Sequence, residues 1–233
     1  DVFEGKNIKV TYNAADKSIM VNNLKVHYSV KYISTGAFDG IRNKFEVIAL
    51  EDTTAKKINT AAFADMTALK EITLPREITE IAADTFRGCT NLETVKIEGD
   101  IESIADNAFK DCKKLTKIIT STNSEEPFDG VDFSSDVVTL GNRVFSGCSS
   151  IKNVLLSEKL TSIGEYCFEG CTSVADIQIG PAVTYIGIKA FDGTSWFKNW
   201  SGDDTTKALV VGDGILIKSV DGSIPEGTKS IAA

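Results

Sequence analysis

The stretch from Ile81 to Ile97 reads Ile81-Ala-Ala-Asp-Thr-Phe86-Arg-Gly-Cys89-Thr-Asn-Leu92-Glu-Thr-Val95-Lys-Ile97. Its pattern returns 23 residues later as Ile104-Ala-Asp-Asn-Ala-Phe109-Lys-Asp-Cys112-Lys-Lys-Leu115-Thr-Lys-Ile118. The apolar residues and the cysteine recur in the same order, and the residues between them are mostly polar. The two copies indicate that one short structural unit is repeated along the chain.

The core of this signature is an Ile or Leu followed five positions later by Phe, and it occurs seven times. The copies are Ile33–Phe38, Ile58–Phe63, Ile81–Phe86, Ile104–Phe109, Leu140–Phe145, Ile163–Phe168 and Ile186–Phe191. Successive Phe residues lie 25, 23, 23, 36, 23 and 23 positions apart. A period of about 20–29 residues is typical of leucine-rich-repeat solenoids, so the signature predicts a solenoid rather than a globule with one central core.

Each unit has a recognisable internal order. The alternation in Leu92-x-x-Val95-x-Ile97 predicts a short strand, and a second apolar pair such as Ile78-x-x-Ile81 predicts another. The Phe is expected in a short helical turn, for example Ala82–Phe86, that ends near Gly88. We therefore expect an α/β fold, a leucine-rich-repeat solenoid of ~23-residue units that stack because one unit alone buries too few apolar side chains.

The extent of the repeat divides the chain into three regions. Residues 1–32 lack the signature and read as a β-rich N-terminal cap, whereas residues 33–193 form the solenoid. Residues 194–233 follow the last complete signature and are expected to contain an aromatic plug, a β-hairpin and the start of a further repeat.

Within the last region, Trp196, Phe197 and Trp200 are interpreted as a plug over the open end of the solenoid, with a carbohydrate-stacking platform as the alternative. The runs Ala208–Val211 and Ile215–Val220 flank a Gly-Asp-Gly turn and predict a β-hairpin. Ile224–Ile231 resembles the second half of a unit, so we expect either that the natural chain continues or that a tail is absent from this sequence.

The step of 36 residues holds 13 more than the usual 23 (36 − 23), and the extra residues fall at about 120–136. Their composition predicts a surface loop. Asp129, Asp132 and Asp136 invite a calcium site, but their spacing is not that of a calcium-binding loop. A plain solvated loop is therefore the main interpretation and calcium the alternative.

Four of the five cysteines follow a repeat Phe by three positions: Cys89, Cys112, Cys148 and Cys171. Because they follow the repeat and match no zinc motif, we expect a ladder of buried thiols, with disulfide or metal binding as alternatives. Cys167 and the single histidine, His27, are the one nucleophile–base candidate, and 140 positions separate them. Distant units of a solenoid do not touch, so we expect no catalytic residue, no metal and no cofactor.

Composition excludes two classes of partner. The net charge is −8 and lysines are interleaved with acidic residues, so the chain lacks the basic patch that a nucleic-acid binder needs. It has no run of about 18 apolar residues, so no membrane span is expected.

Because it opens at Asp1 without Met, we expect either removal of a targeting segment or trimming of the chain.

Side chains that alternate with the inward positions of the first strand point outward, and stacking turns them into rows across one sheet. One row holds Ile48, Thr73, Lys96, Ile119, Leu155 and Gln178; the other holds Glu46, Glu71, Thr94, Lys117, Asn153 and Asp176. Ile119 and Leu155 are expected to be neighbours beside the insertion, where its loop either covers them or leaves an apolar patch exposed. The candidate partner-binding face is Thr94, Lys96, Lys117, Ile119, Asn153 and Leu155.

Ile163–Gly187 has the order Ile-Gly-x-x-x-Phe-x-Gly-Cys-x-Ser-Val-x-x-Ile-x-Ile-Gly-Pro-x-Val-x-x-Ile-Gly and resembles the BspA-type leucine-rich repeat. The resemblance covers about residues 28–233 and departs from the pattern at Ile41, Met66 and Thr194, where Cys is replaced. It implies a secreted or cell-surface bacterial protein of a family whose members are commonly lipid-anchored, so an anchor on a removed N-terminal segment is one expectation for this chain. It also implies adhesion to a host matrix protein, another cell-surface protein or a glycan, and it carries no catalytic residues.

Repetition without any unique polar cluster therefore favours a non-catalytic binding module, and we expect it to be a monomer. A structural spacer within a larger surface protein is the first alternative, and an enzyme-associated domain is the second.

Overall fold

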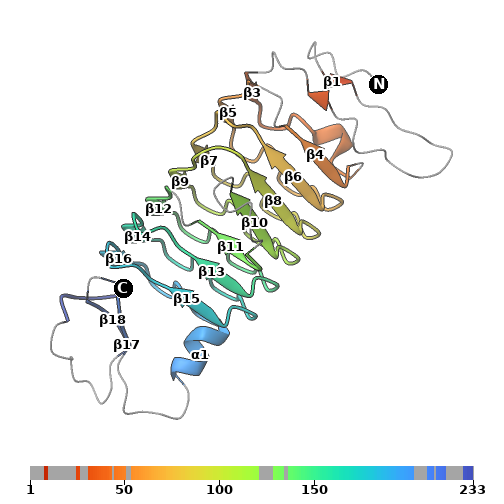
Figure 1. The fold of residues 1–233 in the computed structure, drawn as a ribbon. Coiled ribbons are helices and arrows are strands. Elements are labelled where there is room, and N and C mark those ends of the chain that lie inside the picture. The colour runs from red at the N-terminus through yellow and green to blue at the C-terminus, as the bar shows by residue number, and fades with distance from the viewer. Residues whose placement is uncertain are drawn as a thin grey trace.

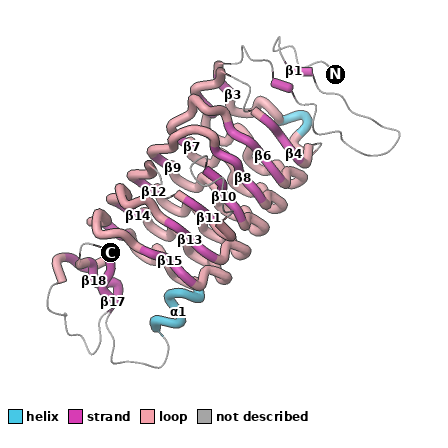
Figure 2. The backbone as a smooth tube through the Cα atoms, viewed as in Figure 1, coloured by secondary structure: helices cyan, strands magenta, loops and turns pink. Residues whose placement is uncertain are grey.

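The computed structural model describes residues 8–9, 25–26, 31–43, 45–50, 54–120, 128–133, 136–201, 209–212, 214–218 and 228–232. Over this part the chain winds into an elongated solenoid whose strands stack along one axis (Figure 1). Figure 2 shows the same strand and turn pattern returning at each winding. The predicted solenoid is confirmed, and within these residues helix is confined to α1 (Ser195–Ser201) and a 3-10 helix at Asp39–Ile41.

The longer strands form a seven-stranded parallel sheet in the order β15-β13-β11-β10-β8-β6-β4. Their bounds are β4 Val47–Ala49, β6 Glu71–Leu74, β8 Thr94–Ile97, β10 Lys117–Thr120, β11 Val131–Asp132, β13 Asn153–Leu155 and β15 Asp176–Gln178. In β6, β8 and β10 the burial alternates along the strand, so Ile72, Val95 and Ile118 point into the core. The predicted inward positions of these strands are therefore confirmed.

The second apolar pair of each unit also forms a strand. These strands are β7 Glu80–Ile81, β9 Ser103–Ile104, β12 Thr139–Leu140, β14 Ser162–Ile163 and β16 Tyr185–Ile186, which pair in parallel as a five-stranded sheet. β3 Tyr32–Ile33 and β5 Lys57–Ile58 pair in the same way at the N-terminal side. The core lies between the two sheets and is filled by the inward Ile, Leu and Val residues of both.

A column of Phe rings runs through this core. Phe38, Phe63, Phe86, Phe109, Phe145, Phe168 and Phe191 stack one on the next, with ring centroids 5.0 to 5.8 Å apart. Each ring is at most 3% exposed, so the column combines apolar burial with favourable ring contacts at every junction between units.

The Phe-bearing segments differ from the short helical turns that were expected. They are successive single turns, because from Phe63 to Phe191 the residues two positions before and after each Phe adopt left-handed conformations, such as Asp84 (φ 57°) and Gly88 (φ 74°). The first segment differs, since Phe38 is followed by the 3-10 helix Asp39–Ile41. A left-handed residue cannot continue a right-handed helix. Alternate N–H groups instead donate to the next unit, as Phe86 does to the carbonyl of Ala108 at 2.8 Å. The turn is thus a further hydrogen-bonded ladder between units.

The composition of the insertion at about 120–136 predicted a surface loop, but this prediction is only partly correct. Residues 121–127 lie outside the described part, but Val131–Asp132 forms strand β11 between β10 and β13. Phe133 is 1% exposed and its ring lies 5.7 Å from that of Phe145. The apolar residues on either side of Asp132 therefore bring this segment into the core, despite the polar residues around it.

Ile48 was expected to point outward and instead is fully buried, in register with Ile72. The cause is one extra residue between Phe38 and its strand, because Val47 pairs with Glu71 although Val47 lies nine positions after its Phe and Glu71 only eight. A shift of one residue reverses which side chains face the core.

At the C-terminal end, Trp196 covers the last ring of the column. Its ring meets Phe191 edge-on with centroids 5.0 Å apart, and it is 8% exposed, so it is not open to stack on a sugar. The Thr194 hydroxyl accepts a hydrogen bond from the Phe197 N–H at 3.0 Å, which caps α1. Thr194 thus stands at the ladder Cys position of a unit that is followed by a helix instead of a strand.

The predicted hairpin is confirmed: β17 Leu209–Val211 pairs antiparallel with β18 Ile215–Lys218. β19 Ser230–Ile231, the expected resumption of the repeat, pairs in parallel with β18 and not with β16. Of the expected N-terminal cap, the structure describes β1 Ile8–Lys9 paired with β2 Lys25–Val26, and the rest of residues 1–30 lies outside the described part. No described helix has the length and hydropathy that crossing a membrane requires.

Candidate functional site

The candidate partner-binding face lies on the outward side of the seven-stranded sheet. Thr94 and Lys96 are on β8 and are in register with Lys117 and Ile119 on β10. Asn153 and Leu155 lie on β13, in register with Asp176 and Gln178 of β15. The two expected rows therefore exist within each of these strand pairs.

The expected contact between Ile119 and Leu155 is wrong, because β11 separates β10 from β13. Asp132 of β11 is in register with Leu155, and Val131 with Ile118, so Asp132 occupies the position between the two apolar residues. Asp132 is 1% exposed, whereas Ile119 and Leu155 are partly exposed. Whether the insertion covers these residues stays a prediction, since residues 121–127 lie outside the described part.

Asp129, just before β11, connects the two halves of the face. Its carboxylate lies 3.9 Å from Lys117 Nζ and 3.9 Å from Lys152 Nζ, and its carbonyl accepts a hydrogen bond from Asn153 Nδ2 at 2.8 Å. Sequence reasoning considered Asp129 only as a calcium ligand and missed this role. The alternation Val131-Asp132-Phe133 was the available signal that a strand, and hence a fixed Asp129, begins here.

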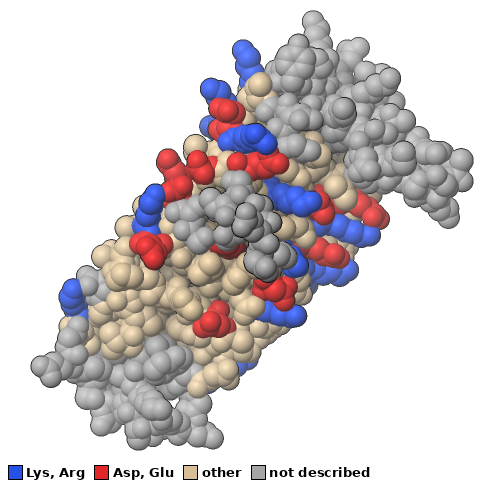
Figure 3. Space-filling model, in the orientation of Figure 1, with Lys and Arg blue, Asp and Glu red and all other residues tan. Residues whose placement is uncertain are grey.

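Ion pairs between neighbouring units continue the face toward its N-terminal end. Lys96 Nζ lies 2.6 Å from a Glu71 carboxylate oxygen, and Lys70 Nζ lies 2.8 Å from Glu46. The hydrogen bond and charge of Glu46 raise the pKa of Lys70 above its usual value. Figure 3 shows charged side chains gathered over the N-terminal half of this view, while the part nearer β15 is mostly uncharged.

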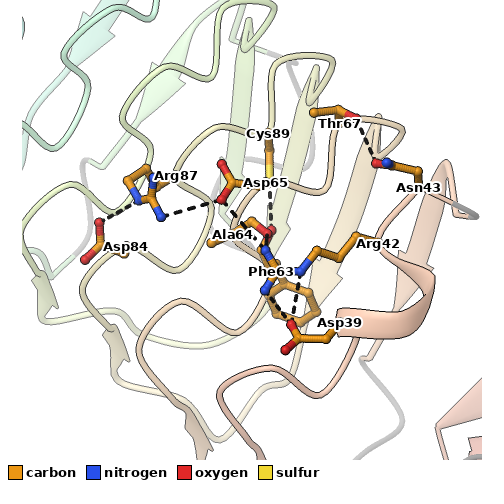
Figure 4. Close-up of polar contacts among 10 residues, drawn as sticks. All are labelled: Asp39, Arg42, Asn43, Phe63, Ala64, Asp65, Thr67, Asp84, Arg87 and Cys89. Atoms are coloured by element: carbon orange, nitrogen blue, oxygen red, sulfur yellow. Dashed lines mark hydrogen bonds and ion pairs between the residues drawn. The ribbon is translucent and has the colours of Figure 1, made fainter.

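A polar network also joins the first units along their Phe-bearing turns (Figure 4). Arg42 Nη1 donates to the Ala64 carbonyl at 2.8 Å and lies 3.7 Å from the Asp65 carboxylate. Asp65 in turn lies 3.5 Å from Arg87, one unit further on. These contacts link three successive units along their Phe-bearing turns.

The three aspartates of the insertion, which were considered as calcium ligands, do not converge. Asp129 faces the two lysines, Asp132 is buried, and Asp136 pairs with Lys159, whose pKa the hydrogen bond raises. Across the described residues, no group of three or more His, Cys, Asp or Glu side chains is placed to hold a metal ion.

The thiol ladder is present as predicted. Cys89, Cys112, Cys148 and Cys171 are unexposed free thiols, and each Sγ donates at 3.0 Å to the Phe carbonyl of the preceding unit. Figure 4 shows one such bond, from Cys89 to Phe63. Burial raises the pKa of Cys89 and of Cys171 to about 12. These groups stay protonated at neutral pH and are poor nucleophiles.

Cys167 is buried as well, and burial raises its pKa well above the usual value for a thiol. A nucleophilic cysteine requires the opposite shift and access to solvent. His27, its only candidate base, lies outside the described residues. The geometry therefore gives the Cys167–His27 hypothesis no support.

Comparison with known proteins bears on the whole repeat region. The family model of the BspA type leucine rich repeat region matches residues 9–129 and 126–208, in 6 copies. No match was found among proteins with curated descriptions.

Solved structures give the same fold. A leucine-rich repeat protein from Eubacterium ventriosum is 25% identical, with a TM-score of 0.57 over 73% of this chain and 42% of its own. One from Bacteroides ovatus is 26% identical, with a TM-score of 0.52 over 87% of this chain and 49% of its own. The T. pallidum leucine-rich repeat protein, 22% identical with a TM-score of 0.56, is covered over 74% of its length and 82% of this chain. The chain thus spans less than half of the first and second of these proteins.

Proposed function

The chain belongs to the BspA-type leucine-rich repeat family, and from this premise we propose that it is a non-catalytic binding module that holds a protein partner on its seven-stranded sheet. Its place of action in this proposal is outside the cell or on its surface. The proposed contact residues are Thr94, Lys96, Lys117, Ile119, Asn153 and Leu155.

The in-register outward rows of the sheet are the observation that carries the proposal. Parallel pairing satisfies the backbone groups of the inner strands, so only side chains are offered to a partner. Asp129 holds Lys117 and Asn153 in place across β11, which reduces the side-chain entropy lost on binding. Partly exposed Ile119 and Leu155 supply the apolar contacts within this charged frame.

Catalysis is not part of the proposal because the five cysteines, the most distinctive nucleophilic side chains, are all buried thiols outside any disulfide. Their raised pKa values suit a core and not a reaction centre. Glu46 and Glu71 of the sheet face pair with lysines of adjacent units, which suits a fixed surface for recognition.

The test is a binding screen of the purified chain against immobilised matrix proteins, mucins and glycans. For any ligand retained, the double variant Ile119→Asp and Leu155→Asp is compared with Val138→Asp and Tyr185→Asp, which alters exposed apolar residues on the side of the other sheet. We expect the first variant to lose binding at least about tenfold and the second to retain it. Equal binding by both variants would remove the sheet face from the proposal.

The same screen separates the alternatives. Retention by glycans and by no protein would identify a glycan-binding face. Retention by nothing at all would favour a spacer, whose stacked units and inter-unit ion pairs keep a fixed length but recognise no partner.

A further inference from the structure

The outward side of the second strands carries two blocks of opposite charge. β3, β5, β7 and β9 follow one another along the solenoid (Figure 1), since β3 pairs with β5, β5 contacts β7 and β7 pairs with β9. On β3 and β5, and at the residue just before each, the exposed side chains are Lys31, Tyr32, Lys56 and Lys57. The equivalent residues of β7 and β9 are Thr79, Glu80, Glu102 and Ser103. A basic block therefore lies directly beside an acidic block.

The charges of both blocks are unpaired among the described residues, although ion pairs join neighbouring units on the seven-stranded sheet. None of these lysines and glutamates forms an ion pair with another described residue, even though Lys57 and Glu80 lie on adjacent strands. A hydrogen bond to Asp136 raises the pKa of Lys159, and Glu102 adds a smaller rise, so this nearby cation is already engaged. The two blocks are therefore available to a partner.

The order of the two blocks makes the strip of β3, β5, β7 and β9 complementary to itself in one orientation. A two-fold axis parallel to the strands, between β5 and β7, reverses the strand order in a second copy. β5 then faces β7 of that copy and β3 faces its β9, so that Lys57 lies opposite Glu80 and Lys31 opposite Glu102. A parallel arrangement of two copies would instead place like charges opposite each other, which is unfavourable.

We propose that this strip binds a second copy of the chain, with the two solenoids side by side and antiparallel. Each of the two ion pairs is made twice, once from each copy, and together they set the orientation of the dimer. Tyr32, which is 61% exposed, lies opposite Ser103 at each end of the contact and supplies the aromatic surface typical of interfaces. The dimer would replace the monomer that the sequence led us to expect.

The size of the strip predicts a weak dimer. Four strands at a spacing of about 4.8 Å span about 14 Å between the outer two, which is short for a stable protein interface. The net charge of −8 on each copy also opposes association. This proposal does not rest on the proposed function, because it uses the outward side of the other strands, so either can fail alone.

The test is sedimentation equilibrium of the full chain over about 5–500 µM. About 0.1 M salt is used, because charges more than about 10 Å apart are then largely screened, whereas pairs in contact are screened less. We expect the average mass to rise from that of one chain toward that of two.

Two charge reversals test the pairing. Lys31→Glu with Lys57→Glu makes the strip acidic, and Glu80→Lys with Glu102→Lys makes it basic. Each variant alone should associate at least about tenfold more weakly than the parent chain, whereas an equimolar mixture of the two should form a dimer. The matched control is Lys113→Glu with Lys114→Glu, the same change of charge at two exposed lysines before β10, and it should associate like the parent chain.

Four results would overturn the proposal: a parent chain that stays monomeric at every concentration, a control that weakens association as much as Lys31→Glu with Lys57→Glu, charge reversals that each associate like the parent chain, or a mixture that stays monomeric. A mass that keeps growing beyond two copies would also overturn it, because a two-fold contact closes at a dimer. All the substituted side chains are partly or fully exposed, and circular dichroism confirms that each variant is folded before it is compared.

Discussion

The rings of Phe109 and Phe145 stack with centroids 5.4 Å apart and planes 3° apart, although 36 positions separate the two residues in the chain. On the sheet side of the same junction, β11 lies between β10 and β13. Those strands are therefore separated by two strand spacings, or about 9.6 Å. The insertion thus widens the sheet while the Phe column continues without a gap.

The first prediction tests whether the insertion is part of the core. Phe133→Ala should lower the free energy of unfolding by about 3–5 kcal/mol, because the ring is 1% exposed and packs on Phe145. Phe128→Ala, in the same insertion but only partly buried, is the matched control and should cost much less. Urea denaturation followed by circular dichroism measures both. Similar small losses would show that the segment lies outside the core.

The second prediction tests the assignment of inward positions in a regular unit. Phe109→Ala should cost about 3–5 kcal/mol, since its ring stacks between Phe86 and Phe145. Lys110→Ala, one position later, leaves the backbone bond from Gly88 to the Lys110 carbonyl intact and should be nearly neutral. Thermal and urea denaturation of the two variants measures both changes. Comparable losses of stability would contradict the assignment of Phe109 as the inward position.

Most of the solenoid could be predicted because its inward positions recur with a constant spacing. That reasoning placed Ile72, Val95 and Ile118 in the core correctly, and it identified the buried cysteines from their distance to Phe. It failed where spacing changes by a few residues. Ile48 is reversed by one added residue, and a period count alone could not show this.

The sequence predicted which strand positions form the candidate face, but it did not predict which of these residues are neighbours. Lys117 and Ile119 lie beside Thr94 and Lys96 because equal steps give equal register. Ile119 and Leu155 are parted because a long step can either loop out or add a strand, and its length permits both. The conformation of the Phe turns was missed for another reason, since hydrogen bonds between units override local helix propensity.

The third prediction concerns the backbone contact between stacked second strands. A Cβ atom at Gly164 would lie 2.3 Å from the carbonyl oxygen of Gly141, so the two strands must move apart to admit it. Gly164→Ala should therefore cost about 1–3 kcal/mol, as overpacking does. At Gly180 the nearest atom to such a Cβ is 3.8 Å away, so Gly180→Ala should be tolerated. Equal melting temperatures for the two variants would contradict the close stacking.

The fourth prediction concerns how the buried thiol of Cys171 makes the free energy of unfolding depend on pH. Burial raises the pKa of Cys171 from 9.0 to about 12, so the folded chain keeps a proton that the unfolded chain releases above pH 9.0. The unfolded state is then favoured as pH rises from 9.0 toward 12, and this thiol's share of stability falls by about 1.4 kcal/mol per pH unit. Below that window the thiol contributes no pH dependence.

Cys171→Ala isolates this contribution. At pH 8 the variant should be the less stable, since it loses buried volume and the hydrogen bond from Sγ to the Phe145 carbonyl. Above pH 9 the parent chain loses stability because the Cys171 thiol ionises only when the chain unfolds, whereas Cys171→Ala has no such thiol. The difference in unfolding free energy between the parent chain and the variant should therefore narrow. Ile177→Val, a change of buried volume without a titrating group, should keep a constant difference at every pH. Urea titrations in reductant across this range measure both, and a Cys171→Ala difference that does not change with pH would mean that the thiol is reached by water in the folded chain.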